Sequence, residues 1–126
     1  MLLICAALAG CGTSERDTDA AAVSGRFLAA VQREDGAAAC DELELSTKSK
    51  LVQQEGRSCA KAILGLDLRQ GDTTDRTSVW STSAYVELKP SGAMFLDEGP
   101  DGWKIAAAGC RPSGSDREPY DCELEG

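Results

Sequence analysis

The cysteines carry most of the chemistry that this sequence makes explicit, because the chain contains six of them and no histidine. Without an imidazole, neither a Ser-His-Asp nor a Cys-His nucleophile can form, and the usual general base near neutral pH is missing. Histidine-based zinc sites are excluded for the same reason. Ser and Thr hydroxyls are plentiful, but no base is available to activate them, so thiols and carboxylates are considered first.

Paired carboxylates occur at Asp41-Glu42, at Asp97-Glu98 and at Glu123 and Glu125. Adjacent side chains point apart on a helix or strand, so these pairs favour a solvated surface over acid–base catalysis. The run from Asp97 to Asp101 offers oxygen ligands, but it lacks the spacing of a calcium loop and fits a hairpin turn. We expect no catalytic residue, no metal site and no cofactor.

Cys11 ends an apolar run that begins at Met1, and it follows the small residues Ala9 and Gly10. The run is long enough for the core of a signal peptide and too short to span a bilayer. Leu8-Ala9-Gly10-Cys11 resembles the lipobox of bacterial lipoproteins, which implies that the Cys11 thiol becomes diacylglyceryl-modified and that a dedicated peptidase cuts before it. We therefore predict a signal peptide over residues 1–10 and a lipidated, solvated tether over 11–18. No Lys or Arg precedes Cys11, which indicates a translation start upstream of Met1.

Four further cysteines are available for disulfides: Cys40, Cys59, Cys110 and Cys122. An even set in an exported protein indicates two bridges, and four cysteines allow three connectivities. Neighbouring pairing, Cys40–Cys59 with Cys110–Cys122, closes the shortest loops and is the pairing we favour. A metal site is the alternative, but no Cys-x-x-Cys spacing occurs.

The formal net charge is −8, with an isoelectric point near 4.5. Such a surface repels phosphates, so we expect no nucleic-acid partner and no docking on anionic headgroups. The length that remains beyond the signal peptide fits one domain, over residues 19–126.

Helical periodicity comes first in that domain. Apolar residues recur at helical spacing from Ala20 to Val31, which predicts an amphipathic helix that ends near Asp35-Gly36. Asp35, Ser46 and Ser58 are then expected to cap three short helices, of which the last two end at Gly56 and Gly65.

From Thr77 the period changes to two. Four strands are expected, over Thr77–Ser81, Ala84–Lys89, Ala93–Asp97 and Trp103–Ala108. Their short turns make an antiparallel meander with one apolar face, on which Ala84, Val86, Leu88, Met94, Leu96, Trp103, Ile105 and Ala107 lie. The helices must cover that face, which gives an α+β fold. The region from Arg111 to Gly126 is expected to be an irregular loop.

Two stretches resemble the NTF2-like superfamily of cone-shaped α+β domains. Phe27-Leu28-Ala29-Ala30-Val31 followed by Asp35-Gly36 is similar to its opening helix and break, and the run from Gly102 to Cys110 is similar to its final strand. With Pro119-Tyr120-Asp121-Cys122, the chain resembles small actinobacterial lipoproteins that carry such a domain. The resemblance implies a cone, in which Phe27, Met94 and Trp103 have two alternative roles: they line an apolar ligand site, or they fill the core, which is the interpretation we favour.

Enzymes of this superfamily place a carboxylate base inside the cone, often with His or Tyr. Here Tyr85 and Glu87 are expected on the solvent face, and Asp67 and Asp97 near strand ends. We therefore expect a non-enzymatic, lipid-anchored protein on the extracytoplasmic face of a bacterial cell membrane, which binds an apolar small molecule or an envelope protein. The alternatives are a small isomerase- or cyclase-like enzyme with an internal carboxylate, and a structural or regulatory companion of another envelope protein.

Overall fold

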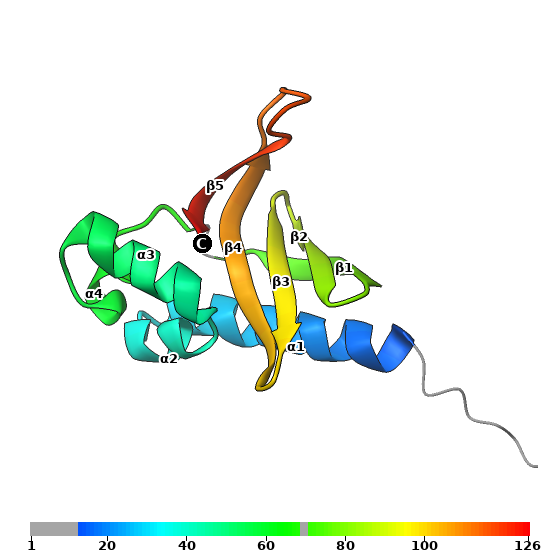
Figure 1. Cartoon of the computed structure of the whole chain (residues 1–126), viewed down its shortest axis with the longest axis horizontal. Helices are drawn as coiled ribbons and strands as arrows, with labels where there is room; N and C mark the ends of the chain where they lie inside the picture. Colours follow the sequence, from blue (N-terminus) through cyan, green and yellow to red (C-terminus); the bar gives the residue numbers. More distant parts are fainter. Residues whose placement is uncertain (1–12, 69–70) are drawn as a thin grey trace, which may run out of the picture.

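The computed structural model describes residues 13–68 and 71–126, in which four helices precede a five-stranded antiparallel sheet (Figure 1). The helices are α1 (Thr13–Gln32), α2 (Gly36–Asp41), α3 (Leu45–Glu55) and α4 (Cys59–Leu64). The strands are β1 (Thr73–Trp80), β2 (Ser83–Lys89), β3 (Ala93–Gly99), β4 (Gly102–Pro112) and β5 (Tyr120–Glu125), paired in that order. The fold class is α+β, as the sequence predicted.

The long helix α1 buries the apolar residues that its periodicity singled out, from Ala20 through Phe27 to Val31. It begins at Thr13, however, so residues 13–18, assigned above to a tether, are helical. Arg16 explains this difference. Its guanidinium contacts the Ser81 carbonyl oxygen and the Glu98 carboxylate and lies 5.4 Å from the centroid of the Trp103 ring. The polar composition therefore belongs to the solvent side of a helix that is held against the sheet.

The break after α1 allows α2 to approach α4 closely. The Asp35 carboxylate accepts a hydrogen bond of 3.0 Å from the Ala38 amide, which caps α2 as expected. A Cβ atom on Gly36 would lie 2.0 Å from the Ala60 carbonyl oxygen, so only glycine fits there. The Cys40–Cys59 disulfide then joins the two helices.

The segment before α3 is attached to the sheet by its backbone. The Glu44 amide donates to the Ile105 carbonyl at 2.9 Å, and the Ile105 amide donates to the Glu42 carbonyl at 2.8 Å. Because of this pairing α3 begins at Leu45, whereas a cap at Ser46 predicts a start at Thr47. The residue before the helix is therefore Glu44, whose side chain forms no capping hydrogen bond. The helix ends at Gly56, which has a left-handed conformation as expected.

The sheet contains a fifth strand where an irregular loop was expected. β4 continues to Pro112, and β5 pairs with it antiparallel, with Cys110 directly opposite Cys122. These two cysteines form the second disulfide, so both bridges have the neighbouring pairing. The prediction of four strands was wrong because the ladder with β4, rather than local propensity, orders the last residues of the chain.

The inner face of the sheet is buried against the helices, with Ala84, Val86 and Leu88 alternating as predicted. A bulge in β4 changes the pattern: Leu96 pairs with Ile105 but Phe95 pairs with Ala107, so one extra residue lies between them. After the bulge Ala108 and Cys110 are buried, and Ala107 is only half-buried. The assignment of Ala107 to the apolar face was therefore wrong.

Candidate functional site

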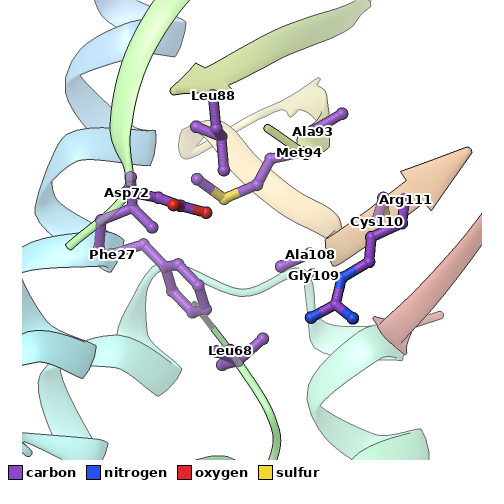
Figure 2. Close-up of a pocket in the computed structure, with 12 residues that line it drawn as sticks. Phe27, Leu68, Asp72, Leu88, Ala93, Met94, Ala108, Gly109, Cys110 and Arg111 are labelled. Carbon is purple, nitrogen blue, oxygen red and sulfur yellow. The ribbon is translucent and has the colours of Figure 1, made fainter. Parts of the chain in front are cut away.

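The interior of the domain brings together two of the three residues expected to hold a ligand. Phe27 of α1 and Met94 of β3 line one cavity between the helices and the sheet, with Leu68 and Leu88 beside them (Figure 2). The cavity has a volume of about 20 Å³. A space of that size accepts about one water molecule, so side chains fill most of the interior.

Trp103 does not line this cavity. Its side chain is 5% exposed and lies under the Arg16 guanidinium, and it borders a shallower hollow beside α1 with Arg26, Glu42 and Lys104. The indole N–H has no hydrogen-bond acceptor within the described part of the chain. The role of all three residues in ligand binding stays a prediction.

Asp72 is the carboxylate that borders the interior cavity, and no pattern in the sequence singled it out. It is 9% exposed and lies just before β1, opposite Met94 and Leu88 (Figure 2). The two carboxylates that were expected near strand ends, Asp67 and Asp97, have other surroundings. Asp67 is exposed and lies 3.5 Å from Arg111, and Asp97 accepts a hydrogen bond of 3.0 Å from the Ser83 hydroxyl.

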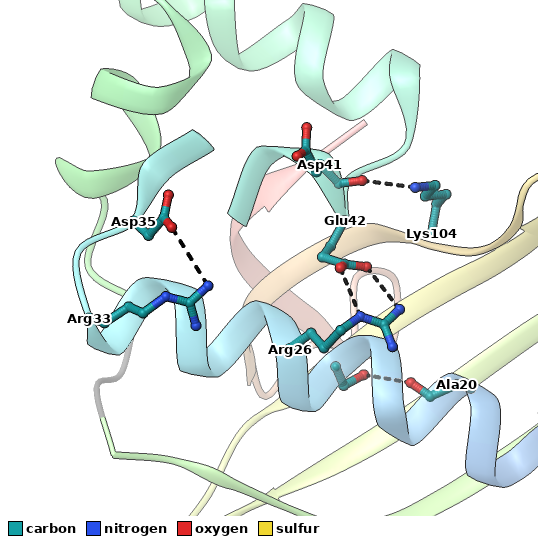
Figure 3. A network of polar contacts seen from close by, with 8 residues as sticks. Ala20, Arg26, Arg33, Asp35, Asp41, Glu42 and Lys104 are labelled. Atoms are coloured by element: carbon teal, nitrogen blue, oxygen red, sulfur yellow. Dashed lines mark hydrogen bonds and ion pairs between the residues drawn. The ribbon is translucent and has the colours of Figure 1, made fainter. Parts of the chain in front are cut away.

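Polar contacts tie α1 to the segment that follows α2 (Figure 3). Arg26 forms a two-pronged pair with the Glu42 carboxylate, at 2.9 Å from Nε and 3.3 Å from Nη2. The Glu42 hydrogen bond raises the pKa of Arg26, against a smaller opposing effect of burial. Lys104 donates to the Asp41 carbonyl at 2.8 Å, so the same segment is held to β4. These contacts hold α1 and β4 to the segment that follows α2. They give Arg26, Glu42 and Lys104 a structural role.

The outer face of the sheet carries a cluster of three aromatic side chains, each half-buried: Tyr85, Phe95 and Tyr120. Tyr85 and Phe95 are directly paired on β2 and β3, with ring centroids 5.4 Å apart. Tyr120 of β5 lies 5.3 Å from Phe95 and 6.2 Å from Tyr85 by the same measure. Half of the six aromatic residues of the chain therefore gather on the face that the helices do not cover.

The two tyrosine hydroxyls are 3.4 Å apart. This hydrogen bond, followed by burial and the neighbouring Tyr120 and Glu87, raises the pKa of Tyr85 to about 12, while Arg76 opposes the shift. Tyr85 therefore stays protonated and neutral at physiological pH.

Two hollows flank the cluster and share Tyr120 as a wall. The larger, of about 470 Å³, lies between Phe95 and the β4–β5 connection, and the smaller, of about 240 Å³, lies between Tyr85 and Pro112. We call the two hollows and the three rings the aromatic groove. Its larger hollow has the rim residues Arg117, Glu118, Asp121 and Glu125.

The sequence placed Tyr85 on the solvent face but did not reveal the groove. Phe95 alternates with Met94 and Leu96, a signal for the outer face that the prediction above did not use, and Tyr120 fell in a predicted loop. The alternation of Tyr120, Cys122 and Leu124 with acidic residues was the signal that could have revealed the fifth strand and with it the third ring.

Within residues 13–68 and 71–126, no group of three or more His, Cys, Asp or Glu side chains is arranged to hold a metal ion. No helix in this part of the chain combines the length and apolar character needed to cross a bilayer. Comparisons with protein-family models, with curated proteins and with solved structures found no match to this chain.

Proposed function

We propose that this chain is a lipid-anchored cell-envelope protein whose single domain binds a partner through its outer surface and performs no catalysis. The observation that carries the proposal is the contrast between the two faces of the sheet. The interior leaves about 20 Å³, whereas the outer face offers a hollow of about 470 Å³ next to three aromatic rings. Ligand sites usually need at least about 300 Å³, which favours the outer face.

An NTF2-like domain is part of this proposal. Support comes from the order of the elements, in which a long helix and short helices precede an antiparallel meander that packs on them. The bulge in β4 adds to it, because bulges bend strands and increase their twist. The break at Gly36, where α2 meets α4, supports the proposal as well.

The anchor is proposed from the sequence alone, since Cys11 lies outside the described residues. Leu8-Ala9-Gly10-Cys11 supports lipidation of that thiol, and the two disulfides support an oxidising location outside the cytoplasm. One residue, Gly12, separates Cys11 from the start of α1.

Replacement of the thiol tests the anchor. We expect Cys11→Ser to move the protein from the detergent phase to the aqueous phase in a detergent phase separation, because two acyl chains are lost. Cys5→Ser is the matched control, since Cys5 lies within the predicted signal peptide and should leave the partition unchanged. Retention of the Cys11→Ser protein in the detergent phase would contradict the proposal.

One observation favours a second candidate, an enzyme with an internal carboxylate. Asp72 is mostly buried and borders the interior cavity, the setting in which a carboxyl group can act as a base. Binding of the neutral apolar dye Nile red separates the candidates. Because the interior cavity of about 20 Å³ holds about one water molecule, an interior site must open before it takes the dye. Such a site predicts that Phe27→Leu changes dye binding and Tyr85→Ala does not, and a surface site predicts the reverse.

A further inference from the structure

The aromatic groove combines an apolar floor with an acidic rim. Its floor is the cluster of Tyr85, Phe95 and Tyr120, whose rings are within 6.2 Å of one another. Its rim carries three exposed carboxylates, Glu118, Asp121 and Glu125, against one guanidinium, Arg117. None of the three carboxylates forms an ion pair within the residues that the structure describes, although seven pairs occur elsewhere there.

The two hollows of the groove lie next to each other. Tyr120 forms a wall of both, with the larger hollow beside Phe95 and the smaller one beside Tyr85 and Pro112. Two adjacent hollows on either side of one ring fit an extended chain better than a compact molecule, because an extended segment presents side chains along its whole length.

Charge decides which kind of segment fits. Aromatic faces attract cations, and carboxylates at the edge of an apolar surface attract Lys and Arg side chains. A second copy of this chain would bring its own acidic surface, since the net charge is −8. The exposed acidic residues of the edge strand β5, Asp121, Glu123 and Glu125, oppose pairing between copies in the same way.

We infer that the aromatic groove binds an extended, basic segment of a protein partner. Apolar or proline residues of that segment lie on the three rings, and its Lys or Arg side chains lie against Glu118, Asp121 and Glu125. This inference rests on the proposed surface-binding function and names the chemistry of the partner.

The test uses the full chain in a non-ionic detergent and two synthetic peptides of about ten residues, one alternating Lys with Pro and one alternating Glu with Pro, which both favour an extended conformation. Titration calorimetry at low salt should show binding of the Lys-Pro peptide and none of the Glu-Pro peptide. The affinity should fall at high salt, because the rim is exposed.

Two double variants with the same change in charge locate the site. Asp121→Asn with Glu125→Gln removes two rim carboxylates. It should lower the affinity for the Lys-Pro peptide about fivefold, which is the effect expected from the loss of two exposed charge pairs. Asp19→Asn with Asp101→Asn is the matched control, because both residues are exposed and line the hollow beside α1 instead. It should leave the affinity unchanged. Phe95→Ala should weaken binding at both salt concentrations, with its fold checked by thermal melting.

Failure of the Lys-Pro peptide to bind, equal binding of both peptides, or equal loss in the two double variants would overturn the inference. A concentration-dependent dimer in sedimentation that Phe95→Ala abolishes would show that a second copy occupies the groove, which overturns it also. These outcomes leave the anchor untouched, since phase separation of Cys11→Ser tests the lipid independently of the groove.

Discussion

Glu44 is a half-buried carboxylate whose ionisation opposes folding. Its amide donates to the Ile105 carbonyl at 2.9 Å, which holds the residue beside β4. Burial, and after it the charge of Asp97, raises the pKa of Glu44. The folded state therefore binds this proton more tightly than the unfolded state, so the contribution of Glu44 to stability is greatest at acidic pH and falls as the pH rises through the folded pKa.

We expect Glu44→Gln to raise the Tm at pH 7, because the neutral amide avoids the cost of a half-buried charge. The difference from the unaltered protein should shrink as the pH is lowered and Glu44 becomes protonated. Thermal melts across that range measure it. Glu34→Gln, at an exposed position, is the control and should change the Tm little at any pH. A difference in Tm between Glu44→Gln and the unaltered protein that grows as the pH is lowered would contradict a raised pKa of Glu44.

At the scale of elements, two glycines with opposite surroundings report on how the helices pack. Gly36→Ala should lower the free energy of unfolding by about 1–3 kcal/mol, because its Cβ would lie 2.0 Å from the Ala60 carbonyl oxygen and force α2 away from α4. Gly25 lies on α1, where a Cβ atom would have nothing within 4 Å of it. Gly25→Ala should therefore raise the same free energy by about 0.5–1 kcal/mol. Urea titrations of both variants would measure the two effects, and equal effects would contradict this packing.

The elements differ in how far the sequence alone predicts them. The sequence correctly predicted α1, α2, β2 and β3, because their apolar residues follow the helical or the alternating period. Local signals also held for two helix ends: Asp35 caps α2, and Gly56 ends α3. The bulge in β4 and the strand β5 depend instead on pairing between distant residues. Nothing in the run of three alanines from 106 to 108 marks an extra residue, and the acidic Asp121 and Glu123 conceal an alternation that pairing with β4 makes regular.

The candidate site, like β5, depends on pairing between residues that are distant in the sequence. The pairing of β2 with β3 makes Tyr85 and Phe95 neighbours, and the pairing of β4 with β5 brings Tyr120 to them. No local spacing relates residues 85, 95 and 120, so the aromatic groove follows from the topology. Phe27 and Met94 were correctly expected in the interior because each lies on the apolar face of its own element.

At the scale of the whole molecule, the groove and the start of α1 lie at different ends of the fold (Figure 1). Arg16, near the start of α1, contacts Ser81 and Glu98, so the β1–β2 turn lies beside the end of the helix that follows Cys11. The β4–β5 connection, which borders the groove, lies at the top of Figure 1, away from that end of α1. A lipid on Cys11 would therefore hold the β1–β2 turn near the bilayer and leave the groove facing away from it.

This orientation is measurable with one added thiol, because the disulfides occupy Cys40, Cys59, Cys110 and Cys122 and the proposed acylation occupies Cys11. A fluorophore on Thr82→Cys, in the β1–β2 turn, should be strongly quenched by a quencher-labelled lipid in vesicles that carry the acylated protein. The same fluorophore on Asp116→Cys, in the β4–β5 connection, should be quenched little. The short spacing between Cys11 and Thr13 is the physical reason, since one intervening residue adds only about 3.5 Å of reach. Equal quenching at both positions would mean that the domain tumbles freely on its anchor, and the groove would then have no preferred direction relative to the membrane.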